Sequence, residues 1–173
     1  MTSTERTDIL EALRKHRELF RFTAQHLTDE QAATRTTASE LTVGGLIKHV
    51  TAVEKEWARF VVEGPVEDHI DWANIDWSNP PAEVLEHANG FQMQDATLAE
   101  LLAAYDAVAA ATDALVESVD LDGSHPLPSA PWFERGAAWS ARRVFLHIVA
   151  ETSQHAGHAD IIRESLDGQK SMG

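Results

Sequence analysis

The sequence predicts an all-α fold, a four-helix bundle with a long crossover connection between its second and third helices. Two observations support this prediction. Four segments of the 173 residues repeat apolar residues at helical spacing, and no segment shows the convincing alternation of a β-strand. The stretch between the second and third segments, residues 64–92, is rich in Trp, Asp, Asn and Pro. Connections of that length are uncommon in compact domains unless they cover something.

The first two helices are predicted from apolar spacing and from capping residues. The first runs over about residues 7–26, and a short turn follows at Thr28, whose spacing to Gln31 is that of a capping box. The second starts after Thr42, a favourable N-cap residue, and continues through VGGLIKHVTAVEKEWARFV.

The last two helices have clear signals at both ends. The third starts at Thr97, where TLAE has the spacing of a capping box, and is expected to end at Asp122 and Gly123. The fourth begins after Ser140, and Gly168 is its expected C-terminal stop.

The composition excludes several kinds of binding partner and of site chemistry. The chain has 28 acidic and 14 basic residues, and a surface that acidic repels the phosphates of nucleic acids and anionic lipids. Because there is no cysteine, disulfides, thiolate metal ligands and a cysteine nucleophile are excluded. We find no secretory signal and no run long enough to span a membrane. These features predict a single cytoplasmic domain over residues 1–173, without nucleic-acid or membrane partners.

The fourth predicted helix carries a carboxylate and three histidines in one sector. Residues four apart on an α-helix differ in direction by about 40°, so Glu151 and His155 point the same way, and His147 and His158 fall in the same sector. The apolar residues of that sector, which predict that it faces the core, are Val144, Ile148 and Ile162. The opposite sector, expected to be solvated, holds Thr152, Ser153, Arg163 and Glu164. An ionised carboxylate on an apolar face is costly unless it is paired or bound to a metal.

The second predicted helix offers a partner for these residues, because His49 lies at the margin of its apolar face. If the second and fourth helices are neighbours, His49, Glu151 and His155 converge. Two imidazoles and one carboxylate form a typical ligand set for catalytic zinc. The alternative is free of metal: core histidines held by hydrogen bonds, with Glu151 paired to His147 or His155. Spacing alone favours neither.

Two segments resemble the DinB-like (YfiT-like) superfamily: LTVGGLIKHVTAVEKEW in the second helix and ARRVFLHIVAETSQHAGHADIIRESLDG in the fourth. They are most similar to the actinobacterial branch related to mycothiol-dependent maleylpyruvate isomerase and mycothiol S-transferases. The resemblance implies a four-helix bundle with a divalent metal, usually zinc, held by one histidine of the second helix and two ligands of the last. Many members have H-x-x-x-H on the last helix. This chain has Glu151 at the first of those positions, as the isomerase-like branch does.

Carried over residue by residue, the resemblance makes His49, Glu151 and His155 the metal ligands. His158 matches a recurrent histidine of the branch that is not a usual ligand, and its role, like that of His147, stays open at this point.

The resemblance implies a metal-dependent S-transferase or isomerase that uses a low-molecular-weight thiol, with S-transfer as the favoured reaction and mycothiol as the expected co-substrate. A metal-bound thiolate would attack a small electrophile. The pKa of a free thiol is about 8.5, and coordination to a dication deprotonates it, so no protein cysteine is needed. Zn²⁺ suits the ligand set best, and Ni²⁺, Fe²⁺ or Mn²⁺ can also occupy such a site. Bacillithiol or glutathione would require a different head-group pocket.

Arg142 and Arg143 begin the fourth helix and are the candidates for binding a carboxylate of the thiol or the substrate. For at least one of them, the expected role is that of a solvated surface charge. Trp57 shares the apolar face of the second helix and is expected in the core. Trp72 and Trp77, in the long connection, are expected to pack against the flank of the bundle.

Two other functions remain open. One is metal-assisted hydrolysis, with metal-bound water as the nucleophile. The other is a non-enzymatic, stress-associated bundle in which the metal is structural or absent. Turnover with and without added thiol separates the first of these from S-transfer. The family is often dimeric, and the sequence does not decide whether this chain forms a homodimer.

Overall fold

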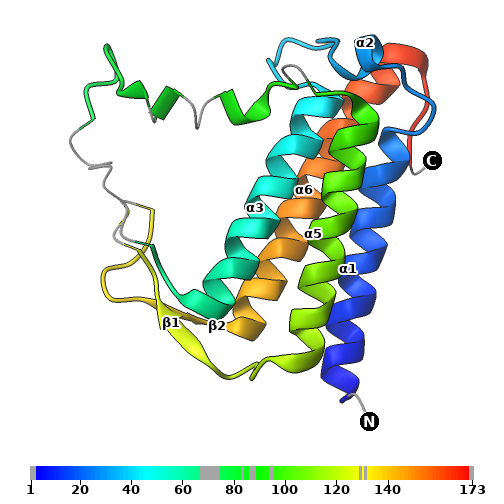
Figure 1. Ribbon diagram of the computed structural model, residues 1–173. Coiled ribbons are helices and arrows are strands. Elements are labelled where there is room, and N and C mark those ends of the chain that lie inside the picture. Colours follow the sequence, from blue (N-terminus) through cyan, green and yellow to red (C-terminus); the bar gives the residue numbers. More distant parts are fainter. Residues whose placement is uncertain are drawn as a thin grey trace.

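The computed structural model describes residues 3–66, 75–82, 84–85, 89–93, 96–128, 130 and 132–171. In this part of the chain, four long helices lie side by side: α1 (Thr4–Thr23), α3 (Val43–Glu63), α5 (Leu98–Ser118) and α6 (Ala141–Asp167) (Figure 1). The short elements are α2 (Asp29–Ala32), the 3-10 turn η2 (Asn89–Phe91) and the strands β1 (Ser124–Pro126) and β2 (Ala138–Ser140). The predicted all-α class is confirmed, and the small sheet is the part that the prediction misses.

The packing of the long helices makes α3 and α6 neighbours. Helix α6 packs against α1 and α3, and α5 packs against the same two helices. Helices α1 and α6 run in one direction, whereas α3 and α5 run in the other (Figure 1). The connection between α3 and α5 therefore returns the chain to the end at which α3 began.

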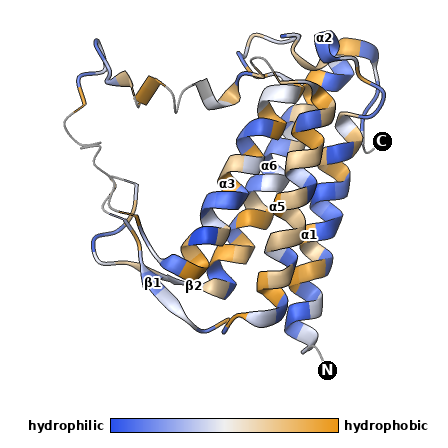
Figure 2. Cartoon of the chain, in the orientation of Figure 1, coloured by the Kyte–Doolittle hydropathy of each residue, from blue (hydrophilic) through white to orange (hydrophobic). Residues whose placement is uncertain are grey.

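Two apolar clusters fill the space between the helices, one toward each end. The largest side chains of the first are Phe20, Leu46, Ile47 and Tyr105, and those of the second are Leu13, Phe60, Phe145 and Ile148. Each long helix carries both hydrophilic and hydrophobic residues, as expected when only part of its surface is buried (Figure 2).

A buried polar layer separates the two clusters. It contains one residue from each long helix: Arg17, Glu54, Thr112 and Thr152. The Arg17 guanidinium donates to Glu54 Oε1 at 2.5 Å and to Asp113 Oδ1 at 2.7 Å. Both charges of the Arg17–Glu54 pair are withdrawn from water. Removal of either partner would therefore leave the other as an unpaired buried charge and destabilise the fold.

The predicted N-caps are confirmed. The Thr42 side chain accepts a hydrogen bond from the Gly45 N–H, Ser140 accepts one from Arg143, and Thr97 forms the full capping box with Glu100. The capping box of Thr28 with Gln31 is also present at the start of α2.

Helix α1 begins and ends three residues earlier than predicted. The Ser3 side chain accepts from the Arg6 N–H and so caps the helix before Thr4. At the other end, the Arg163 guanidinium donates to the carbonyls of Thr23 and Gln25. These bonds satisfy carbonyls that would otherwise lack partners at a helix C-terminus. His26 then adopts a positive φ of 63°, which excludes it from the helix.

Helix α5 also ends early, so the predicted stop at Asp122 and Gly123 is wrong. Val119 is already extended, and the Asp120 side chain accepts from the Asp122 N–H to form a turn outside the helix. The turn leads into β1, which pairs antiparallel with β2. Ser140 therefore ends a strand and caps α6 at the same time. Gly168 ends α6 as predicted, with a φ of 82°.

The expectation that one sector of α6 is solvated is wrong for two of its four residues. Thr152 and Arg163 are 1% and 2% exposed, whereas Ser153 is half-buried and Glu164 is exposed. The reason is that α6 is covered by α1 on one side and by α3 on another, so more than one of its faces is buried.

Two of the tryptophans can be compared with their expected positions. Trp57 is half-buried and packs against the second apolar cluster, as expected from its place on the apolar face. Trp77 is 68% exposed, so it does not pack against the flank of the helices as predicted. Trp72 lies outside the described residues. Among the helices that the structure describes, none is both long and apolar enough to cross a membrane.

Candidate metal centre

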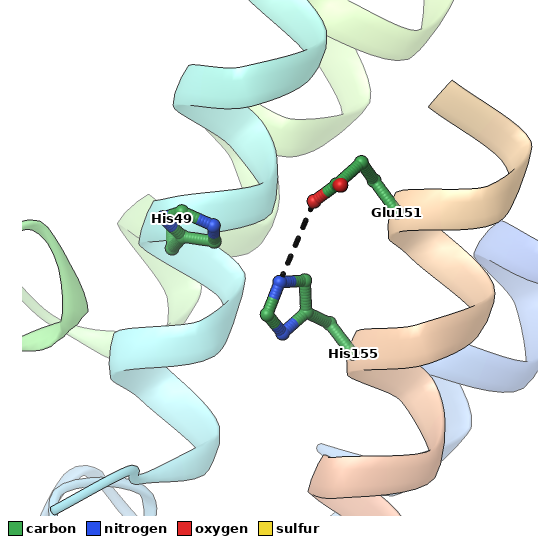
Figure 3. A group of neighbouring side chains, drawn as sticks. All are labelled: His49, Glu151 and His155. Atoms are coloured by element: carbon green, nitrogen blue, oxygen red, sulfur yellow. Dashed lines mark ion pairs between the residues drawn. The ribbon is translucent and has the colours of Figure 1, made fainter. Parts of the chain in front are cut away.

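The three predicted ligands meet between α3 and α6. His49 lies in the second turn of α3, after the Thr42 cap, and Glu151 and His155 lie one turn apart in the middle of α6. Their side chains point toward one another from the two helices (Figure 3). One ligand atom from each residue can be chosen so that all three atoms lie within 4.8 Å of one another. His155 is buried, and the other two are half-buried.

Glu151 contacts two histidines of its own helix. Its Oε2 lies 3.6 Å from His155 Nε2, and its Oε1 lies 3.8 Å from His147 Nε2. The contact with His155 is the main cause that lowers the pKa of the Glu151 carboxyl, and the nearby imidazoles of His147 and His49 lower it further against the opposing effect of burial. The carboxylate is therefore ionised at neutral pH, the form in which it binds a cation.

The donor set fits a divalent metal. Two imidazole nitrogens and one carboxylate oxygen form a three-ligand set of the kind that holds catalytic zinc and leaves one coordination position open. Ligand atoms of one tetrahedral zinc ion lie about 3.4 Å apart, given bonds of roughly 2.1 Å. The separation of 3.6 Å between His155 Nε2 and Glu151 Oε2 is close to that value.

An aromatic group borders the centre on the side of His147. Trp57 of α3 stacks on Trp139 of β2 with ring centroids 4.8 Å apart, and the His147 ring packs edge-on against both at 4.9 and 5.0 Å. Burial is the main cause that lowers the pKa of His147, and the positive charge of Arg143 lowers it further, against the opposing effect of Glu151. His147 is therefore neutral at pH 7.

Phe91 covers His49 and is the site residue that the sequence analysis misses. Its ring stacks on the His49 imidazole with centroids 3.9 Å apart and planes 21° from parallel. The stack depends on Gly45, because a Cβ atom at that position would lie 1.7 Å from the Phe91 carbonyl oxygen. The Lys48 ammonium also donates to the Gln92 carbonyl. The only signal in the sequence was the Gly44–Gly45 pair at the start of a helix, which indicates a close approach of backbone.

The two arginines at the start of α6 have different surroundings. Arg142 pairs with Glu5 and with Asp122, so its guanidinium is already engaged by carboxylates of the protein. The Arg143 guanidinium lies 4.1 Å above the Trp139 ring, in cation–π geometry. Through Trp139, Arg143 is linked to the aromatic group beside the candidate metal centre.

Two further ionisable side chains of α3 and α6 lie outside the ligand cluster. Glu56 of α3 is an exposed carboxylate that pairs with Arg59. His158 lies beside His155, one turn further along α6, with a nitrogen–nitrogen separation of 3.4 Å. It is not among the residues whose ligand atoms cluster.

Comparison with known proteins assigns the chain to a family. A family model described as mycothiol-S-transferase matches residues 8–168. The chain belongs to the mycothiol-S-transferase family. The matched range includes α3 and α6, so the DinB-like resemblance of those two segments is confirmed.

A solved structure supports the fold of this mycothiol-S-transferase family member. It is the crystal structure of the conserved protein of a locus from Enterococcus faecalis. The similarity covers 98% of this chain and 99% of that one, with a TM-score of 0.64 and 16% sequence identity. At that identity, the likeness shows the fold alone. No curated protein gives a significant match to the chain.

Proposed function

We propose that this protein is a metal-dependent mycothiol S-transferase that acts on small electrophiles. Membership of the mycothiol-S-transferase family supports the reaction. The observation that most supports metal dependence is the convergence of His49, Glu151 and His155 from two helices. In this proposal, residues 1–173 form one DinB-like domain. The four long helices are its four-helix bundle, and the stretch between α3 and α5 is its long crossover.

His49, Glu151 and His155 would hold the metal, with zinc as the best match to their donor atoms. A bound dication lowers the pKa of a thiol that it binds, so that a thiolate nucleophile is available at neutral pH. The ionised Glu151 contributes negative charge to the centre, and Phe91 fixes the plane of the His49 ring.

Arg143 is the better of the two arginines for binding an anionic group of the thiol or of the electrophile. Arg142 is engaged by Glu5 and Asp122, whereas Arg143 packs on Trp139 beside the aromatic group that contacts His147. An aromatic face under a guanidinium holds it in place while its N–H groups remain able to donate to a carboxylate.

The test is thiol conjugation by metal-free and zinc-reconstituted protein. Mycothiol and monochlorobimane are suitable substrates, because the fluorescent thioether forms as chloride and a proton are released. We expect turnover that requires both mycothiol and zinc, and that is lost in His49→Ala, Glu151→Ala and His155→Ala. His16→Ala is the matched control, since His16 contacts Ser153 on α6 but lies outside the ligand cluster.

Retained thiol conjugation in metal-free His155→Ala would overturn the proposal. Turnover of an ester that is independent of added thiol would instead support the hydrolase alternative, in which water replaces the thiol as nucleophile. No observation in the described residues favours hydrolysis over S-transfer.

A further inference from the structure

The imidazole of His155 has a different neighbour at each nitrogen. Its Nε2 faces Glu151 Oε2 at 3.6 Å, on the side of the candidate metal centre. Its Nδ1 lies 3.4 Å from Nδ1 of His158, and the two ring centroids are 5.3 Å apart. His155 is only 8% exposed, so its Nδ1 has little access to water.

Metal binding determines which nitrogen of His155 must carry the proton. A neutral imidazole has one N–H donor and one lone pair. If Nε2 gives its lone pair to a metal, the proton is on Nδ1, where it needs an acceptor. Metal-ligating histidines usually donate this second N–H to a neighbouring group, which fixes the tautomer and the direction of the ring.

His158 can supply that acceptor in one protonation pattern. Two Nδ1 atoms that face each other form a hydrogen bond only when one of them carries a proton and the other a lone pair. His158 must then be neutral, with its own proton on Nε2. The same geometry argues against His158 as a fourth ligand, because its Nδ1 points at the far nitrogen of His155 and not at the cluster of ligand atoms.

We propose that His158 is a positioning residue for the metal centre. Its Nδ1 accepts a hydrogen bond from the Nδ1–H of His155 and so holds His155 in the tautomer whose Nε2 lone pair faces the metal. This inference rests on the metal site of the proposed function, and it concerns only the tautomer and the ring orientation of His155 at that site.

The first test compares the zinc affinities of four proteins by competition with a chelating dye: wild type, His158→Ala, His158→Asn and His158→Gln. The oxygen of an asparagine side chain can occupy about the place of the histidine Nδ1, whereas glutamine extends one carbon further. We expect zinc binding to be weaker by about 10- to 100-fold in His158→Ala and His158→Gln, the usual effect of losing such a partner. His158→Asn should restore most of the affinity.

A purely structural role for His158 gives a different pattern. If His158 only fills space, Asn and Ala should be equally poor replacements, and that result would overturn the proposal. An unchanged zinc affinity in His158→Ala would overturn it as well. Circular dichroism of each variant excludes loss of folding as the cause of a weaker affinity.

The second test reads the hydrogen bond of His155 directly in the zinc-bound protein. Nitrogen-15 NMR at pH 8 should show a His155 Nδ1–H that exchanges slowly with water in the wild type and in His158→Asn. In His158→Ala the same proton should exchange much faster, because its acceptor is lost. Equally fast exchange in the wild type and in His158→Ala would overturn the inference. Because neither test involves turnover, a protein that binds zinc through this pair but transfers no thiol would refute the proposed function alone.

Discussion

Replacing Gly45 with alanine should weaken metal binding from a distance, because it displaces the ring that covers His49. A Cβ atom at Gly45 would lie 1.7 Å from the carbonyl oxygen of Phe91 and 2.6 Å from its carbonyl carbon. Both contacts are with backbone, so no side-chain rotation relieves them. Since Gly45 is in the first turn of α3, the segment that carries Phe91 must move by about 1.7 Å or more to reach an ordinary contact distance.

The size of the effect follows from the stack that is lost. Aromatic pairs contribute about 0.5–1.5 kcal/mol beyond the area they bury. If that energy holds the His49 ring in the orientation that binds metal, its loss raises the zinc Kd by about 2- to 13-fold. Phe91→Ala removes the ring without moving the backbone and should give the same change.

The assay is zinc titration of Gly45→Ala and Phe91→Ala in competition with a chelating dye. Gly157→Ala is the matched control, because Gly157 is also helical and a Cβ atom there meets no other group within 4 Å. The control should raise the Tm by roughly 2–4 °C, from a helix-propensity gain of about 1 kcal/mol, and leave the Kd unchanged. Zinc affinities at the wild-type level in both Gly45→Ala and Phe91→Ala would refute the reasoning.

Three further predictions concern the buried charges, the caps and the arginines. Glu54→Ala leaves Arg17 buried without its main partner and should lower the free energy of unfolding by about 3–5 kcal/mol in urea titrations, whereas Arg17→Met combined with Glu54→Leu should recover most of the loss. An Arg17→Met/Glu54→Leu protein as unstable as Glu54→Ala would contradict this account. The backbone N–H and side chain of the capping threonine lower the pKa of Glu100, so its contribution to stability is present above pH 4.5 and is lost as the pH falls through the lowered pKa. Glu100→Gln keeps the cap without a titrating group, so its Tm should fall less on acidification than the Tm of the wild type. Equal falls in the two proteins would argue against this role of Glu100. In steady-state kinetics, Arg143→Ala should raise the KM for an anionic substrate at nearly constant kcat, and Arg142→Ala should leave the KM unchanged. A raised KM in Arg142→Ala with an unchanged KM in Arg143→Ala would show that Arg142 binds the anionic group.

The parts of the fold that depend on neighbouring residues in the chain could be predicted from the sequence. Thr42, Thr97 and Ser140 cap helices because their side chains reach N–H groups only three residues away, and Gly168 ends α6 through its own φ. Helical periodicity places Glu151 and His155 on one face of α6, but it does not show that α3 is the neighbour of that face. The meeting of His49 with these two residues is expected only if the two helices are neighbours, and it is the family resemblance that implies it.

The features that depend on long-range packing could not be predicted in the same way. The end of α1 is set by Arg163, about 140 residues further along the chain, and the burial of Thr152 follows from helices on two sides of α6. Phe91 lies in a connection without periodicity. The Gly44–Gly45 pair indicates a close approach of backbone but does not identify the segment that approaches. The pairing of β1 with β2 involves only three residues on each strand, too few to show alternation.

The measurement that tests the central claim most directly is the metal content of the purified, tag-free protein beside Glu151→Ala and His155→Ala. Elemental analysis should find about one zinc per chain in the wild type and almost none in either variant, while circular dichroism shows that all three keep their helices. A wild-type protein that holds no metal after incubation with zinc or nickel would contradict the claim. Full zinc content in both variants would contradict it too, because the metal would then be bound elsewhere.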